Sequence, residues 1–275
     1  MKVKAKEIIL KTRKNVFGDM LGNNASIFHG EGFEFAEIRE YQYGDDVRKI
    51  DWKTTAKLKK PYVKIYHEER EINVVVSTMF SGSTYFGTTK QKSEYMAEIL
   101  AILGFSAVNN KDKFSHILFA DKLYHASKPS KKIFSVYKEV ERALEFNPLH
   151  KEAKYKEWVD TLFKRIKKRS LIFLIGDFIG EVDLRLLAKK HDLFVIIVRD
   201  YFEENPKPLG YLSLVDPETL NIFEGDVSED LIKSYKKAII KNDRALYKHF
   251  RENSIRFVKL FTNEEPYIKI AKKMV

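Results

Sequence analysis

The chain has 275 residues, of which 44% are hydrophobic and none is cysteine. This composition suffices for a packed core, and the lack of cysteine excludes a disulfide framework, a thiolate nucleophile and a cysteine zinc site. The net charge of +11 is concentrated in two basic segments, residues 1–14 and 131–169.

The first 66 residues give a weak structural signal. A short amphipathic helix is predicted over residues 3–14. Residues 15–60 contain five glycines and no sustained periodicity, so we expect this stretch to be irregular and loop-rich. A strand is predicted at residues 62–66, where apolar and polar side chains alternate.

From residue 72 onward, apolar runs alternate with amphipathic stretches. The runs predict strands buried on both faces, and apolar residues at helical spacing predict the helices between them. Strands are expected at residues 72–79, 115–120, 122–126, 171–176, 193–198 and 255–261, and helices at residues 89–108, 130–145, 152–168, 182–190, 228–249 and 264–274. This alternation predicts an α/β fold with a mostly parallel sheet and helices on both faces.

The change of pattern near residue 72 predicts two parts. Residues 1–71 would form an N-terminal extension, and residues 72–275 the α/β domain, with a small hairpin insertion near residues 205–225. No apolar run reaches the ~20 residues of a membrane span, and the N-terminus lacks the apolar stretch of a signal peptide. We therefore expect a cytoplasmic protein.

The two basic segments could attract nucleic acid or an anionic surface. Aromatic residues do not alternate with the basic ones, as a groove that stacks single-stranded bases requires. We therefore favour solvated helix faces and expect no nucleic-acid partner. Binding of an anionic surface or nucleic acid through the basic helices stays an alternative, which a steep salt dependence of affinity would support.

Two polar turns follow predicted strands. Ser81 and Ser83 come after the strand at 72–79, and Asp177 comes after the strand at 171–176. Ligands gather at the carboxyl ends of strands in such sheets, and hydroxyl and carboxylate oxygens suit Mg²⁺ or Ca²⁺. From spacing alone we favour the alternative that these side chains cap helices or shape loops, because a single carboxylate is meagre for a divalent cation.

Two longer stretches carry a more specific signal. The first contains GEGFEF at 30–35, REY at 39–41, GDDVRKIDW at 44–52 and TAK at 55–57, and the second contains GDFIGE at 176–181 followed by the run from His191 to Leu220. Together they resemble the domain-of-unknown-function 58 family. The resemblance implies a von Willebrand A-like, Rossmann-type domain with an N-terminal extension, associated with MoxR-type AAA+ ATPases.

Von Willebrand A domains carry D-x-S-x-S at the end of the first strand, as part of a metal-ion-dependent adhesion site. Aligned through Phe86-Gly87-Thr88, this chain has Met79, Ser81 and Ser83 at those positions, and Asp177 matches the family's later aspartate. A thioether does not replace a carboxylate for Mg²⁺. We therefore expect a degenerate site with lost or weak metal binding, whose residues serve as a docking edge.

The family motif in the extension has three interpretations. We favour a structural one, with a turn at Gly44 and Asp45, arginines paired with carboxylates, and the Trp52 ring buried against the main domain. A partner interface is compatible with it. The alternative is a carboxylate-metal enzyme, which we favour less because no nucleophile–base pair can be named. The motif residues are Glu34, Arg39, Tyr41, Gly44, Asp45, Asp46, Arg48, Asp51 and Trp52, and the alternative uses Asp45, Asp46 and Asp51.

The resemblance therefore implies a non-enzymatic protein-interaction module without a cofactor. It would be an adaptor that works with a MoxR-type AAA+ ATPase, or with another von Willebrand A-like protein, in protein assembly or maturation. Peripheral membrane association through such partners belongs to the same expectation.

Overall fold

The computed structural model describes residues 6–12, 35–66 and 71–274. The chain forms two compact units, one made of residues 1–28 together with 73–275 and the other of residues 29–72. Within the described ranges, no helix has the length and apolar character needed to span a membrane.

The smaller unit is built on an antiparallel pair of strands, β1 (Phe35–Glu40) and β2 (Tyr62–Tyr66). A short 3-10 helix, η2 (Val47–Lys49), and the helix α2 (Trp52–Leu58) lie between them in the chain. The prediction of an irregular stretch was therefore wrong for residues 35–40 and 52–58, which form a strand and a helix. These elements are too short for a periodic signal, and caps and strand pairing define them instead.

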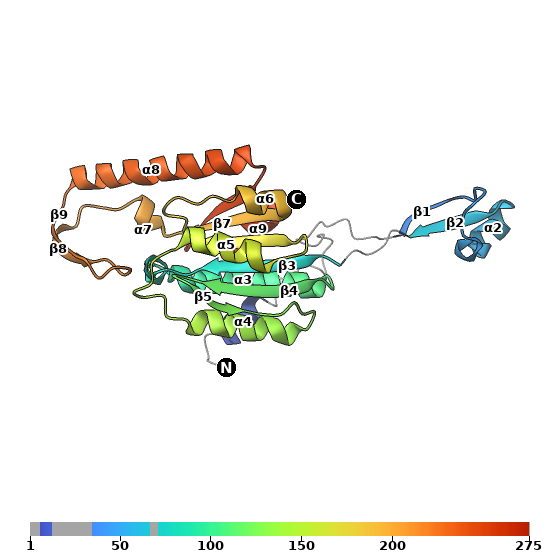
Figure 1. Ribbon diagram of the computed structural model, residues 1–275, viewed down its shortest axis with the longest axis horizontal. Coiled ribbons are helices and arrows are strands. Elements are labelled where there is room, and N and C mark those ends of the chain that lie inside the picture. Colours follow the sequence, from blue (N-terminus) through green and yellow to red (C-terminus); the bar gives the residue numbers. More distant parts are fainter. Residues whose placement is uncertain (1–5, 13–34, 67–70, 275) are drawn as a thin grey trace. The chain divides into compact units, whose positions relative to one another are not determined.

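The larger unit contains a six-stranded sheet in the order β10-β7-β6-β3-β4-β5 (Figure 1). The strands are β3 (Asn73–Met79), β4 (Lys113–Phe119), β5 (Leu123–Ala126), β6 (Leu171–Gly176), β7 (Asp192–Arg199) and β10 (Arg256–Phe261). All neighbouring pairs are parallel except β4 with β5. The strand order changes direction between β3 and β6, which is the doubly wound arrangement.

Helices cover both faces of this sheet (Figure 1). One face carries α3 (Lys92–Asn109), α4 (Ile133–Glu145) and α9 (Pro266–Met274), and the other carries α5 (Tyr155–Arg165), α6 (Arg185–Lys190) and α8 (Glu229–Glu252). The hydrophobic core on the second face includes Trp158, whose indole N–H donates to the Ser77 hydroxyl of β3 at 2.8 Å. This arrangement confirms the predicted α/β fold with a mostly parallel sheet and helices on both faces.

The N-terminal helical residues 6–12 belong to this larger unit. Lys11 Nζ lies 3.3 Å from Glu98 Oε1 of α3 and 2.8 Å from Glu265 Oε1. We predicted these residues to be part of the extension, because a short basic helix does not reveal from its sequence which unit it contacts.

A hairpin of β8 (Gly210–Val215) and β9 (Ile222–Val227) follows the short helix α7 (Tyr201–Glu204). Its tip lies against the start of η3 (Gly82–Tyr85), the turn after β3. The His150 N–H donates to the Pro217 carbonyl at 2.8 Å, and a Cβ placed on Gly82 would lie 2.2 Å from that oxygen. Only glycine fits at position 82 without moving the hairpin tip, which thus covers the carboxyl end of β3.

Candidate functional site

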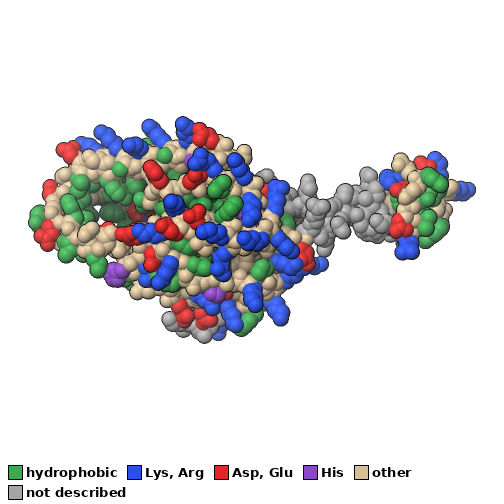
Figure 2. Space-filling view, in the orientation of Figure 1, with side chains coloured by type: hydrophobic (Ala, Val, Ile, Leu, Met, Phe, Trp, Pro, Cys, Tyr) green, Lys and Arg blue, Asp and Glu red, His purple; other side chains and the backbone are tan. Residues whose placement is uncertain are grey.

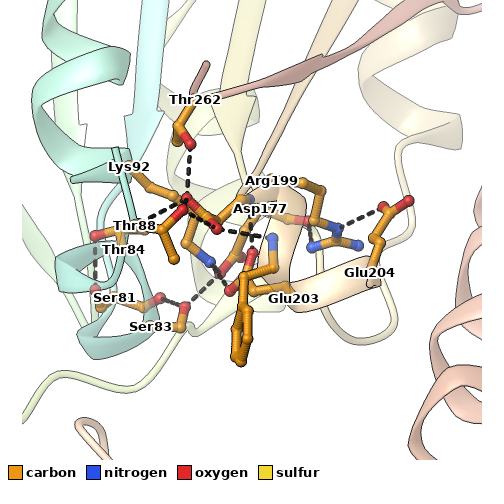
Figure 3. A network of polar contacts seen from close by, with 12 residues as sticks. Ser81, Ser83, Thr84, Thr88, Lys92, Asp177, Arg199, Glu203, Glu204 and Thr262 are labelled. Carbon is orange, nitrogen blue, oxygen red and sulfur yellow. Dashed lines mark hydrogen bonds and ion pairs between the residues drawn. The ribbon is translucent and has the colours of Figure 1, made fainter. Parts of the chain in front are cut away.

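The carboxyl ends of β3 and β6 bring three of the predicted residues together (Figure 3). The hydroxyl oxygens of Ser81 and Ser83 lie 2.7 Å apart, and Ser83 donates to Asp177 Oδ2. The other carboxylate oxygen, Oδ1, accepts a hydrogen bond of 3.0 Å from the Tyr155 hydroxyl. The two polar turns therefore meet on one edge because β3 and β6 are adjacent parallel strands.

Met79 does not take part in this polar cluster. Its side chain is fully buried and belongs to the hydrophobic cluster on the α5 face of the sheet. A Cβ placed on Gly176 would lie 3.3 Å from the Met79 Cβ, so the two strand ends are packed closely here. The residue at the first position of the degenerate motif is thus a core residue.

A buried ammonium group occupies the cluster. Lys92 is fully buried, and its Nζ lies 3.4 Å from Asp177 Oδ2 and 2.5 Å from Glu203 Oε1. Lys92 is the first residue of α3, where the helix dipole disfavours a cation. The two carboxylates are therefore what stabilises the charge, and the ammonium supplies the cation that these acidic groups require.

The protonation state of Asp177 follows from these neighbours. Burial alone raises the pKa of the carboxyl, but the charges of Lys92 and Arg199, with hydrogen bonds from Ser83 and Tyr155, hold its pKa below the usual value. Burial, reinforced by the Asp177 charge, raises the pKa of the Tyr155 phenol well above its usual value. Asp177 is thus an anion in the folded protein, and Tyr155 is its neutral hydrogen-bond donor.

A second group of charges continues the cluster from the end of β7 (Figure 3). Arg199 is fully buried, donates to the Asp177 carbonyl, and places Nη2 3.2 Å from Asp243 Oδ1 of α8. Lys259 of β10 lies 2.6 Å from both Asp243 Oδ2 and Glu204 Oε1. These contacts tie β6, β7, β10 and α8 together through paired charges.

Asp200 makes hydrogen bonds with two further segments at this edge of the sheet. Its carboxylate accepts hydrogen bonds from the Thr88 N–H at 2.9 Å and from the Thr262 hydroxyl at 2.7 Å. It also caps α7 in a capping box with Glu203. Glu203 therefore both stabilises the helix start and contacts Lys92.

The hairpin tip covers the cluster. The Ser83 N–H lies 3.4 Å from Glu218 Oε1 in the tip, Ser81 is fully buried, and Asp177 is only 2% exposed. The predicted docking edge is therefore mostly covered in this conformation, and of its polar side chains only Ser83 is partly exposed. The sequence could not reveal this cover, because the hairpin is far away in the chain.

The three aspartates of the GDDVRKIDW segment have separate structural roles in the smaller unit. Arg39 makes a bidentate pair with Asp45, with distances of 2.7 and 2.8 Å. Asp46 accepts from the Arg48 N–H at 3.0 Å, and Asp51 caps α2 by accepting from the Lys53 N–H at 3.1 Å. No group of three or more metal-ligating side chains occurs in the described part of the chain. The geometry that the enzyme alternative requires is therefore not present there.

Details of the structural interpretation need correction. The carboxylate that pairs with Arg39 is Asp45, and Glu34 lies outside the described residues. Gly44 has a φ of +103°, which agrees with the predicted turn. The Trp52 side chain is 70% exposed at the start of α2, so its ring is not packed within the smaller unit, and its predicted burial against the main domain stays a prediction. Tyr41 is half-buried, and its N–H donates to the Pro61 carbonyl at 2.8 Å.

Sequence reasoning missed several residues of the cluster. Arg199 and Asp200 stand directly after a predicted strand, so the rule that selected Asp177 could have selected them too. Lys92 and Glu203 offered no such signal, because each lies in a polar stretch without a distinctive motif.

Comparisons with known proteins support the resemblance. A family model described as "Protein of unknown function DUF58" matches residues 37–245. Uncharacterised proteins of Mycobacterium bovis and Mycobacterium tuberculosis are 24% identical over 237 residues, which cover 83% of this chain and 74% of theirs.

Two solved structures from Bacteroides also align with this chain. The conserved hypothetical protein BatB of Bacteroides thetaiotaomicron aligns with a TM-score of 0.46 and 13% identity, over 74% of this chain and 97% of its own. An aerotolerance-related membrane protein of Bacteroides fragilis aligns with a TM-score of 0.46 and 11% identity, over 74% and 98%. These scores are too low to support an inference about function.

Proposed function

The chain belongs to the DUF58 family, and on that premise we propose that it is a non-enzymatic protein-interaction module. In this proposal it acts as an adaptor for a MoxR-type AAA+ ATPase, or for another von Willebrand A-like protein, in protein assembly or maturation. A cytoplasmic location and peripheral membrane contact through partners belong to the same proposal.

The observation that carries this proposal is the exposed apolar hairpin. Tyr211, Val215 and Ile222 are 75%, 56% and 65% exposed, and the strand register pairs Val215 with Ile222. Figure 2 shows hydrophobic side chains gathered over β8 and β9. A two-stranded hairpin is marginally stable alone, and exposed apolar patches commonly mark protein–protein contacts. We therefore place the docking face on the hairpin that covers the carboxyl edge.

The buried lysine supports docking that needs no metal ion. The Lys92 ammonium already lies between Asp177 and Glu203, so a divalent cation would have to displace this tethered cation. Repulsion between the two cations makes simultaneous occupancy unfavourable. The proposed contact with the partner thus depends on apolar burial and hydrogen bonds rather than on an ion bridge.

The proposal is tested by capturing a purified MoxR-type ATPase on the immobilised full chain, with and without nucleotide. The Tyr211→Ser/Ile222→Ser double variant should lose capture, because it removes two exposed apolar anchors. The matched control is Leu186→Ser/Ile268→Ser, which changes apolar side chains of similar exposure on α6 and α9 and should capture normally.

Metal dependence provides a second readout in the same experiment. Without nucleotide, a chelator should leave capture by the wild-type chain unchanged. Equal capture by both double variants, or complete loss of capture on chelation, would contradict the proposed docking mode.

A further inference from the structure

β10 (Arg256–Phe261) forms one edge of the six-stranded sheet. It pairs with β7 on one side, and among the described residues no strand pairs with its other side. An edge strand of this kind presents unpaired backbone N–H and C=O groups, which can pair with an added strand.

A groove of about 610 Å³ runs along this edge. It is lined by Ile255, Arg256, Phe257, Val258 and Lys259 of the β10 segment and by Lys269, Lys272 and Lys273 of α9. Five consecutive lining residues belong to one extended segment, so the groove follows the strand direction. Its shape therefore suits an extended chain rather than a compact small molecule.

Every ionisable residue that lines this groove is basic. Lys259 is neutralised by Glu204 and Asp243, and Lys269 pairs with Glu264 at 2.5 Å. Lys272 and Lys273 are exposed, and neither takes part in an ion pair among the described residues. The groove thus presents uncompensated positive charge beside an open backbone edge.

We propose that this edge binds an extended acidic segment of a partner protein, which adds a strand next to β10. Backbone pairing gives the segment its extended form, and the α9 lysines select acidic side chains. A second copy of this chain fits less well, because two such edges would bring lysines against lysines. Nucleic acid could contact the lysines but cannot pair with the backbone of β10.

The test uses a fluorescent peptide of about six alternating valine and glutamate residues, the length of a typical strand. Fluorescence anisotropy with the full chain should show saturable binding that weakens as salt is raised. A peptide with lysine in place of glutamate should not bind. The same acidic peptide with N-methylated backbone amides should bind at least about tenfold more weakly, because it cannot complete the strand pairing.

Charge-reversed variants locate the site. Lys272→Glu/Lys273→Glu should weaken peptide binding about tenfold. The control Lys237→Glu/Lys241→Glu changes the same charge on exposed lysines of α8 outside the groove, and it should bind as wild type does. Hydrogen exchange of the β10 amides should slow when the acidic peptide is bound.

Four outcomes overturn the proposal. They are no binding of the acidic peptide at about 1 mM, equal binding of its N-methylated form, equal effects of the two double variants, and binding of a DNA oligonucleotide at this groove in preference to the peptide. Each is independent of the ATPase capture experiment, because the hairpin variants do not alter this groove.

Discussion

Replacing Lys92 by methionine removes the buried cation and keeps a side chain of similar length. In the wild-type protein the ammonium lies between Asp177, which is 2% exposed, and Glu203, whose side chain is 13% exposed. The variant leaves Asp177 without its main countercharge. Removing one partner of a buried ion pair typically costs about 3–5 kcal/mol. We expect the lower end, about 3 kcal/mol, because Glu203 lies close enough to solvent to regain water.

The pH dependence of the free energy of unfolding separates this effect from a loss of packing. Burial raises the pKa of Asp177, and in the wild type the Lys92 and Arg199 charges reverse that effect and lower it. Because the pKa of Asp177 is lower in the folded than in the unfolded protein, its ionisation stabilises the fold at pH values above the unfolded-state pKa of about 3.9. This stabilisation is lost as the pH falls through the folded-state pKa. Without Lys92, Asp177 loses the largest of the effects that lower its pKa, so its anionic form should be less stable in the folded variant at neutral pH, whereas its protonated form in acid is little affected. The destabilisation should therefore be largest near pH 7 and shrink toward pH 4.

Urea unfolding at several pH values measures both quantities. Lys237→Met, which removes an exposed lysine from α8, is the matched control and should change the free energy of unfolding by less than about 0.5 kcal/mol. A Lys92→Met variant as stable as this control, or one whose destabilisation does not vary with pH, would refute the role assigned to the buried ammonium.

Three further results are expected. Millimolar Mg²⁺ should leave the melting temperature unchanged, since a ligand stabilises only by binding the folded state. A clear rise in the melting temperature would show that the cluster accepts a metal. The Met79→Asp variant should be less stable and should not gain a response to Mg²⁺, because Met79 lies in the core. Trp52→Ala should cost less than about 1 kcal/mol in urea unfolding because the ring is exposed at the start of α2, and a loss of several kcal/mol would show that the ring is buried in the folded chain. Gly82→Ala should push the hairpin tip, through Pro217, away from position 82 at a cost of about 1–3 kcal/mol and speed proteolysis of residues 216–221, whereas unchanged cleavage would mean that the tip does not rest on Gly82.

The sheet could be predicted from the sequence because its strands are buried on both faces. The runs at β6 and β7 are continuously apolar, and this pattern requires helices above and below. The smaller unit could not be predicted in the same way. Its helix α2 has only 7 residues and no buried side chain, so it lacks an apolar face.

Part of the candidate site followed from topology, and the rest depended on distant contacts. Asp177 and the two serines were predictable because each follows a buried strand. The role of Lys92 was not, since its partners Asp177 and Glu203 lie 85 and 111 residues away in the chain. The exposure of the Trp52 side chain also could not be predicted from the sequence, because an aromatic residue at a helix start does not indicate which side it faces.

The hairpin is connected to the buried cluster through the short helix α7. Glu203, which contacts Lys92, lies in α7, and only five residues, 205–209, separate that helix from β8. At the other end, the tip rests on Gly82 and reaches Ser83 through Glu218. The hairpin is therefore connected to the cluster at two places, through Glu218 at Ser83 and through α7 at Glu203.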